Sequence, residues 1–376
     1  MRGRCVDGRG TWWSRCTRLT HGYRIELTAH IYFVANIDFT GDEELVMRTK
    51  AGTRRQILAL AVLLAGFIIL PASAQELKLW RHGIVEAKSD AGIVFMGSKG
   101  GFAEKQGLRI EIQQFKGDTL ALKALLAGEL DSYEGNPGSP MIAASRGADV
   151  KLVGCYWPGL TYAIYSKASI NSPAELKGKT FAISAPGSLP DLLARAVLAQ
   201  NKLTVADVKF TIMGSDADRF KALAAGIVDA AAASTGLAPE AEKSGVKMLV
   251  HAIDAVPNYI RFCIYSTSKT LAARNEDAVH FLAAEIAGFR HALANRDQTL
   301  ALTREITLAK PDNPQPAFIY DEIKRLSAVD PDMPIPMNKL VWMRDLLVTT
   351  GNLTKPVDLD AFVDGDIRAR ALKIVK

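Results

Sequence analysis

The sequence is poor in cysteine. It has four in 376 residues, and only Cys155 and Cys263 lie beyond position 75. This number excludes a small scaffold held by many disulfides, and no C-x-x-C pair for zinc or thiol redox chemistry occurs. In an oxidising compartment the two later cysteines could form a bridge. The sequence leaves that question open, because it does not show whether the two residues approach each other.

No strong excess of one charge follows the first 74 residues. The chain has 46 Lys and Arg against 40 Asp and Glu, and ten of the basic and six of the acidic residues precede Gln75. From Gln75 onward the balance is therefore 36 to 34, which gives no stripe for nucleic-acid phosphates, and we expect no nucleic-acid partner. A hydrophobic share of 48% and a charged share of 23% exclude a disordered chain. The length fits two domains.

Motifs for catalysis and for metal binding are also missing. The chain has no G-x-S-x-G, H-E-x-x-H, P-loop or G-x-G-x-x-G motif. His82, His251, His280 and His291 are far apart, without Cys or carboxylate neighbours at metal-ligand spacing. We therefore predict a protein that is not an enzyme and that uses neither a metal nor a cofactor.

The longest apolar run is too short to span a membrane. It covers the 14 residues 57–70, whereas a spanning helix needs about 20. Basic residues precede it from Met47 onward, and the small residues 71–74 follow it, which is the pattern of a secretory signal peptide cleaved after Ala74. We thus predict a signal peptide over 47–74 and a periplasmic mature protein.

Two points about this leader stay open or hypothetical. Arg54 and Arg55 leave both general secretory and twin-arginine export open. A signal peptide acts at the N-terminus of a chain, so we interpret residues 1–46 as a misassigned extension and Met47 as the start of translation.

A self-similarity with an offset of 98 residues organises the remainder of the chain. The segment 123–131, KALLAGELD, recurs at 221–229 as KALAAGIVD. The same offset relates Asp118 to Asp216 and Asn136 to Ser234. Each copy predicts a strand, a capped short helix, a second strand and a polar loop. The predicted ranges are 108–115, 120–127, 130–133 and 135–140 in the first copy, and 208–213, 220–225 and 228–233 in the second.

Other elements are predicted from caps and periodicity. A Ser-Pro-Ala-Glu capping box starts a turn at 172–175, and Ser188 opens a helix through Leu198. Further strands are expected at 151–154, 246–250 and 260–266, and helices at 276–295, 317–327 and 338–349. Strands alternating with short helices favour right-handed βαβ crossovers and mostly parallel sheets.

Several phrases of the body are similar to a known family. They are GFAE at 101–104, LAGELD at 126–131, SPAELKGK at 172–179, AAGIVD at 224–229 and VDLD at 357–360. Their order and spacing resemble the substrate-binding proteins of nitrate, sulfonate and taurine ABC transporters, which share a domain with thiamine-pyrimidine precursor proteins. The resemblance covers nearly all of 77–365.

This resemblance implies an α/β type II periplasmic-binding fold. Lobe I is expected at 75–165 plus 262–376 and lobe II at 166–261. The lobes would close by hinge motion on a small organic or oxyanionic solute. The protein would be a monomer that passes its solute to the membrane permease of an ABC importer. The alternative is an enzyme or binding protein of pyrimidine or thiamine-precursor metabolism.

Candidate ligand-binding residues follow from the matching loops, because ligands bind outside the carboxyl ends of strands in open α/β sheets. A ligand that drives closure must contact both lobes. The candidates are, for lobe I, Ser89, Asp90, Asp118, Thr119, Asn136, Tyr156 and Trp157 and, for lobe II, Ser188, Asp216, Ser234, Thr235, Asn258 and Tyr259. Helix capping is an alternative role for Asp118, Thr119, Ser188 and Asp216, and lobe packing for Tyr156 and Trp157.

The charge of the ligand stays open. Serine hydroxyls and helix N-termini suit an oxyanion, whereas Glu86, Asp90, Glu134 and Asp216 near the expected mouth would repel one. An aromatic ligand stacked on Trp157 is a further possibility.

Overall fold

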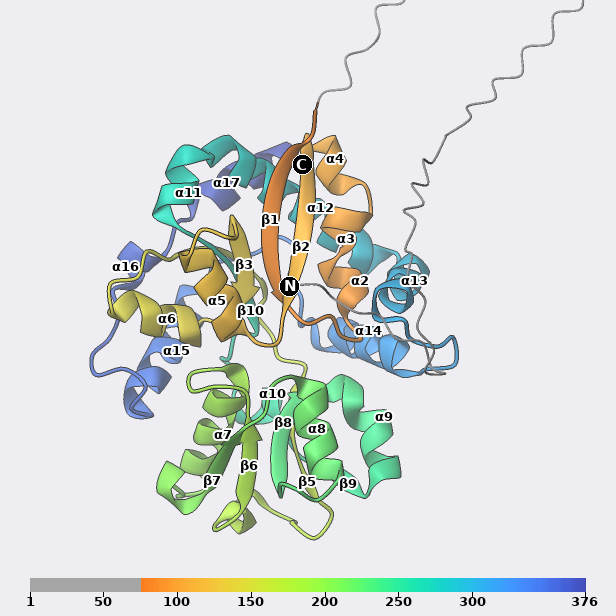
Figure 1. The fold of residues 1–376 in the computed structure, drawn as a ribbon, viewed down its shortest axis with the longest axis vertical. Helices are drawn as coiled ribbons and strands as arrows, with labels where there is room; N and C mark the ends of the chain where they lie inside the picture. The colour runs from red at the N-terminus through yellow and green to blue at the C-terminus, as the bar shows by residue number, and fades with distance from the viewer. Residues whose placement is uncertain (1–75) are drawn as a thin grey trace, which may run out of the picture. The chain divides into compact units, whose positions relative to one another are not determined.

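The computed structural model describes residues 76–376, which belong to one compact unit (Figure 1). The expected extension at 1–46 and signal peptide at 47–74 lie outside the described residues. Within 76–376, no helix combines the length and the apolar character needed to cross a bilayer.

Two five-stranded mixed sheets form the frameworks of two lobes (Figure 1). The first sheet has the order β2-β1-β3-β10-β4, with β1 Lys78–Val85, β2 Leu108–Phe115, β3 Ser132–Gly135, β4 Lys151–Trp157 and β10 Phe262–Ser266. The second has the order β7-β6-β8-β5-β9, with β5 Tyr162–Lys167, β6 Thr180–Ile183, β7 Lys209–Ile212, β8 Ala230–Ser234 and β9 Val246–His251.

The two sheets have the same topology. In each, the central strand (β1 or β6) pairs in parallel with both of its neighbours. A single antiparallel strand then lies between the last two parallel ones, β10 between β3 and β4, and β5 between β8 and β9. The predicted α/β class with mostly parallel sheets is confirmed.

Each antiparallel strand is the first strand after the chain has crossed from the other lobe. Strand β4 of the first sheet ends at Trp157, and the chain then enters the second sheet as β5 at Tyr162. The lobe boundary expected at 165/166 therefore falls inside a strand, because the pattern alone does not show which sheet a crossing strand joins. We propose that lobe II begins at Tyr162, with the first crossing at 158–161.

The helices of the repeat obey the predicted offset. Helix α5 (Asp118–Leu126) and helix α8 (Asp216–Ala224) have equal lengths and lie 98 residues apart. Each is followed by a glycine with positive φ, Gly128 at 78° and Gly226 at 73°, a conformation that other residues adopt only with strain. The strands that follow start two residues later than predicted, because the glycine turn takes up residues that the apolar pattern assigned to the strand.

Helices α12 (Asn275–Ala294), α14 (Gln315–Leu326) and α15 (Met337–Thr349) confirm the three long helices predicted in the C-terminal region. Helix α13 (Arg296–Thr307) was not predicted. It starts just after Asn295, whose backbone leaves the helical region with φ −122°, so a single residue separates it from α12.

The remaining helices are mostly short. Helix α7 (Leu189–Gln200) extends two residues beyond its predicted end, and α6 begins at Gly138, inside the stretch predicted as a loop. The other short helices are α2 Ala91–Val94, α3 Met96–Lys99, α4 Phe102–Lys105, α6 Gly138–Ser145, α9 Ala238–Ala241, α10 Ala252–Ala255, α11 Ser268–Ala273, α16 Leu359–Phe362 and α17 Asp366–Ile374. Four 3₁₀ turns are η1 Pro173–Leu176, η2 Val205–Asp207, η3 Thr235–Leu237 and η4 Glu242–Ser244.

A disulfide joins Cys155 of β4 to Cys263 of β10, so the bridge that the sequence left open is present. Both residues are fully buried. The bond ties the strand before the first crossing to the strand after the second. It therefore fixes the lobe I ends of both connecting segments.

We predict that replacing both cysteines by serine (Cys155→Ser, Cys263→Ser) destabilises the protein. The bridge closes a loop with a sequence separation of 108 residues, for which chain entropy gives at most about 4–5 kcal/mol. The free energy of unfolding of the variant, measured in urea without reductant, should be lower than that of the oxidised wild type. It should be close to that of the wild type measured with reductant. Equal stability of the variant and the oxidised wild type would contradict a structural role for the bridge.

Candidate functional site

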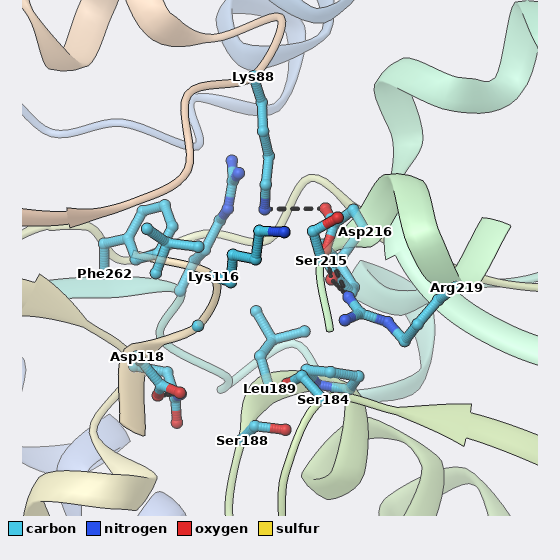
Figure 2. Close-up of a pocket in the computed structure, with 16 residues that line it drawn as sticks. Lys88, Lys116, Asp118, Ser184, Ser188, Leu189, Ser215, Asp216, Arg219 and Phe262 are labelled. Carbon is cyan, nitrogen blue, oxygen red and sulfur yellow. Dashed lines mark hydrogen bonds and ion pairs between the residues drawn. The ribbon is translucent and has the colours of Figure 1, made fainter. Parts of the chain in front are cut away.

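The candidate site is a cavity between the two lobes, with a volume of about 50 Å³. Figure 2 shows side chains from both lobes around it. The lining residues are Val85, Lys88, Lys116, Gly117, Asp118, Asn136, Arg261 and Phe262, and from lobe II Tyr162, Ser184, Ser188, Leu189, Pro190, Ser215, Asp216 and Arg219.

Strand ends and helix starts place these residues. Strands β1, β2, β3, β6 and β7 all run towards the cavity with their carboxyl ends, and the loops after them supply most of the lining. Helices α5, α7 and α8 begin at the cavity, so their free N–H groups and positive dipole ends lie near it. This is the place where open α/β sheets bind ligands.

Asp216 is the centre of an ion cluster that crosses the cleft. Its Oδ2 lies 2.9 Å from Nζ of Lys88 in lobe I (Figure 2). Its Oδ1 contacts the Arg219 guanidinium and accepts a hydrogen bond from the Tyr162 hydroxyl. Burial alone would raise the pKa of Asp216, but the two cations and the Tyr162 hydroxyl hold it well below the ordinary range. Asp216 is therefore an anion that is paired with one cation from each lobe.

Arg219 is a positioning residue rather than a free cation. It is 2% exposed, and it donates to the carbonyls of Ala232 and Gly214 as well as to Tyr162 and Asp216. All of its hydrogen bonds lie within lobe II.

Asp118 occupies the equivalent position in lobe I without a cation in contact. Its Oδ2 accepts from the amide of Asn136 and from Oγ of Ser139 at 3.2 Å. Burial raises the pKa of Asp118 to about 6, against the opposing effect of Ser139 and backbone N–H groups. Asn136 Oδ1 in turn accepts from the Gly138 N–H at 2.9 Å. The first lobe thus presents a carboxyl group that is protonated in part near neutral pH.

Arg261 is the last residue of the second crossing, the segment 252–261 between β9 and β10, and it contacts lobe I. Its guanidinium donates to Asp90 Oδ2 at 2.6 Å and to Thr161 Oγ1 at 2.8 Å. It lies over the Trp157 ring, 4.1 Å from the centroid, and over Phe262 at 4.6 Å. The side chain is 1% exposed. It therefore neutralises Asp90 and covers the face of Trp157.

Glu134 lies beside Arg261 in a second, smaller cavity that adjoins the first. The Tyr156 hydroxyl donates to its Oε2. Complete burial raises the pKa of Glu134 to about 8, and the negative charge of Asp90 adds to this effect. Glu134 is therefore mostly neutral at pH 7.

The first turn of α7 has no side-chain cap. Ser188, the residue before the helix, donates to the Ala185 carbonyl at 2.6 Å and accepts from the Ala185 N–H, so it closes its own loop. Ser184 and the first turn of α7 then face the cavity, as Figure 2 shows for Ser184, Ser188 and Leu189.

A family model described as NMT1/THI5 like matches residues 88–299, more than half of the chain. The chain belongs to the NMT1/THI5-like family. The matched range includes every residue of the cavity lining except Val85. No curated protein sequence matches the chain.

Solved structures share the fold of this NMT1/THI5-like protein. The alkanesulfonate-binding protein SsuA of Xanthomonas axonopodis pv. citri, bound to MOPS, has 19% identity and a TM-score of 0.65, and the match covers 76% of this chain and 98% of that one. The periplasmic aliphatic sulphonate binding protein SsuA of Escherichia coli has 21% identity and a TM-score of 0.61, with 76% and 92% covered. The desulfurization enzyme DSZB has 16% identity and a TM-score of 0.57, with 80% and 100% covered.

These comparisons confirm the predicted family resemblance and the two-lobed periplasmic-binding fold. Both binding proteins and an enzyme share this fold, so the fold alone does not decide between them. Within residues 76–376, no three His, Cys, Asp or Glu residues are placed to hold a metal ion.

Four of the sequence-predicted candidates line the main cavity, Asp118, Asn136, Ser188 and Asp216. The capping role weighed for the two aspartates is not the observed one, because the N-cap residues are Gly117 and Ser215 and each aspartate is the first residue of its helix. Asp90 lines the smaller cavity.

The other candidates lie elsewhere. Ser89 donates to Gln315, and Thr119 lines a separate surface groove. Tyr156 and Trp157 are fully buried in the core of lobe I, and Arg261 occupies the Trp157 face on which an aromatic ligand was considered. Tyr259 is buried with its hydroxyl 3.4 Å from Asn136 Oδ1, Asn258 is exposed, and Ser234 and Thr235 lie at a contact between the lobes.

Among the lining residues that sequence reasoning missed are Lys116, Tyr162, Arg261 and Phe262. A signal existed for Lys116, since it stands between a predicted strand and Gly117-Asp118. None existed for the other three, which lie on or beside the crossings, and their places depend on how the chain exchanges between lobes.

We predict that Glu134→Gln flattens the loss of stability with rising pH. The pKa of Glu134 is about 8 in the folded protein against about 4.5 unfolded. The folded state therefore holds the extra proton between these values, so its stability falls as pH rises from about 4.5 to about 8 and levels off above that. Urea unfolding measures the free energy of unfolding of both proteins. From pH 5 to pH 9, the difference between variant and wild type should change in favour of the variant by on the order of 3 kcal/mol. The exposed Glu129→Gln is the control, and parallel curves for Glu134→Gln and wild type would refute the assignment.

Proposed function

We propose that this protein is the extracytoplasmic solute-binding component of an ABC importer, which captures a small organic anion of the sulfonate class between its lobes. The observation that carries the proposal is the cationic lining of a cavity shared by both lobes. A solute that contacts both lobes lowers the free energy of their closed arrangement, and closure is the event that such a carrier needs.

The charges around the cavity favour an anion. Four cations line it, Lys88, Lys116, Arg219 and Arg261. Lys88 and Arg219 are both paired with Asp216 and Arg261 with Asp90, and the carboxyl of Asp118 also lines the cavity, so the cations exceed the acids only through Lys116 and the shared pairing of Asp216. Of the acids that the sequence placed near the mouth, Asp90 and Glu134 do not repel an anion strongly, and Glu86 lines the smaller cavity rather than the main one. Asp90 is paired with Arg261, and Glu134 is mostly neutral at pH 7.

Lys116 is the cation best suited to contact the solute. It is exposed at the cavity and forms no ion pair within residues 76–376. Lys88 is shared with Asp216, and the first turn of α7 adds N–H groups on the lobe II side. An oxyanion between these groups would receive charge-assisted hydrogen bonds from both lobes.

The cavity also has an apolar part, formed by Val85, Leu189, Pro190 and Phe262. This part fits a short carbon chain next to the anionic group, which supports an organic sulfonate over nitrate. Among the sequence-predicted candidates, we propose Asp118, Asn136, Ser188 and Asp216 as parts of this ligand site. Asn136 acts through Asp118 and the Gly138 turn.

We propose export to the periplasm and delivery to a membrane permease as the setting of this function. The Cys155–Cys263 disulfide supports an oxidising compartment. The two sulfonate-binding proteins with the same fold support the carrier role. One of them is described as periplasmic, which supports the proposed location.

An enzyme of pyrimidine or thiamine-precursor metabolism is the alternative, and the shared fold of a desulfurization enzyme keeps it in view. The one position weighed for stacking a flat ring, the face of Trp157, is covered by Arg261. Incubation with sulfonates, sulfinates and pyrimidines separates the two functions. Binding without product supports the carrier, and product formation from any of these compounds supports the enzyme.

We predict that Lys116→Gln weakens binding of short alkanesulfonates by about tenfold, roughly 1.4 kcal/mol. The lost interaction is a charge-assisted contact at a partly exposed site, so the effect should shrink at high salt. Isothermal titration calorimetry of the wild type and the variant measures it.

The matched control is Lys221→Gln, an exposed lysine of α8 outside the cavity lining, which should bind like the wild type. If alkanesulfonates bind neither protein, or if both variants lose the same affinity, the proposed anion site is wrong.

A further inference from the structure

One face of helix α14 reaches from lobe I to lobe II. Gln315, Ile319 and Glu322 are spaced by four and three residues, which places them on one side of the helix. Each of them contacts lobe II at a different point. We call these three residues the α14 face.

Glu322 makes the central contacts of the α14 face. It is 7% exposed. It accepts a hydrogen bond from the hydroxyl of Thr235, the first residue of η3 in lobe II. Its Oε1 lies 2.8 Å from Nε2 of His251 at the end of β9. One carboxylate of lobe I therefore holds two separate elements of lobe II.

The other two residues extend the contact along the helix. Gln315 donates to Glu240 of α9 at 3.1 Å. Ile319 is 1% exposed and lies against Gly236 of lobe II. The two residues are so close that a Cβ built on Gly236 would be in van der Waals contact with Cβ of Ile319, at 3.7 Å. The contact thus combines an apolar centre with polar groups at both ends, as a stable packed interface does.

None of the three residues lines the solute cavity or the smaller cavity beside it. A role in direct solute contact is therefore excluded by position. Their partners belong to the β8–η3 turn, α9 and β9, all of which must separate from α14 if the lobes open.

We propose that the α14 face is a clasp for lobe II and that Glu322 is a positioning residue that sets solute affinity from outside the cavity. The inference rests on the proposed function only where it concerns affinity. The clasp stabilises the closed arrangement that holds the solute relative to the open one. Loss of the clasp favours opening of the solute-bound protein, so the solute leaves sooner and affinity falls.

The first experiment needs no solute. Nitroxide labels are placed at the exposed positions Lys99→Cys in lobe I and Lys209→Cys in lobe II, in the full chain with Cys5 and Cys16 replaced by Ser. Pulsed electron spin resonance then measures the distances between the labels. We expect Glu322→Ala to lose part of the short-distance population that the wild type shows.

Asp321→Ala is the matched control. Asp321 is the neighbouring residue of the same helix, but its ion pair with Arg296 stays within lobe I at 2.9 Å. It should leave the distances unchanged. Thr235→Val removes the same hydrogen bond from the lobe II side with little change of volume, and it should act in the same direction as Glu322→Ala. Equal distance distributions for wild type, Glu322→Ala and Thr235→Val would overturn the clasp.

The second experiment measures alkanesulfonate binding. Glu322→Ala should weaken affinity about 5- to 20-fold, within the range of ordinary coupling energies, and should do so through faster dissociation rather than slower association. The double variant with Thr235→Val should be little weaker than Glu322→Ala alone, because both changes break one contact. Additive losses, or a loss confined to association, would contradict the clasp. If no alkanesulfonate binds the wild type, the proposed function fails, and the label distances still decide the inference.

Discussion

The architecture depends on one constraint, which is that each sheet is completed by a strand arriving from the other lobe. β5 follows the first crossing and inserts between β8 and β9, and β10 follows the second and inserts between β3 and β4. Because an inserted central strand cannot leave without breaking two ladders of hydrogen bonds, the crossings are anchored at both ends. The disulfide between β4 and β10 strengthens the lobe I end. Relative motion of the lobes is thereby confined to the short segments between these strands, next to which Arg261 and Tyr162 line the cavity.

The electrostatics of the cleft follow from this arrangement. Burying a carboxylate is costly unless it is paired or protonated, and the structure uses both solutions. Asp216 and Asp90 are paired with cations, whereas Glu134 and Asp118 have raised pKa values. Of the four acids that the sequence placed near the mouth, Asp90 and Asp216 are thus paired and Glu134 has a raised pKa, and the fourth, Glu86, lines the smaller cavity. Lys116, which is unpaired within residues 76–376, and the helix N-termini add positive potential in the main cavity.

Much of the fold could be predicted because the signals are local. The 98-residue repeat with its glycine stops predicted α5 and α8, and the periodicity of the C-terminal region predicted α12, α14 and α15. The candidate site was predictable only in part. Asp118, Asn136, Ser188 and Asp216 follow strand ends, and the rule that ligands bind at such ends applies to them. Trp157 also follows the rule in sequence, yet its strand continues through it into the core, where Arg261 packs on it. Long-range pairings of this kind leave no trace in local patterns.

The repeat also shows how equivalent positions come to serve different purposes. Asn136 and Ser234 both accept a hydrogen bond from the N–H two residues on, from Gly138 and Gly236, and both bind the aspartate that opens the preceding helix. In lobe I this turn faces the cavity. In lobe II the same turn contains Thr235, and it packs against α14, an element that follows both sheets in the chain and has no counterpart in the repeat. Local structure was thus kept in both copies, while the surroundings differ. A duplicated fold can in this way use one turn at the cavity and its copy at the contact between the lobes.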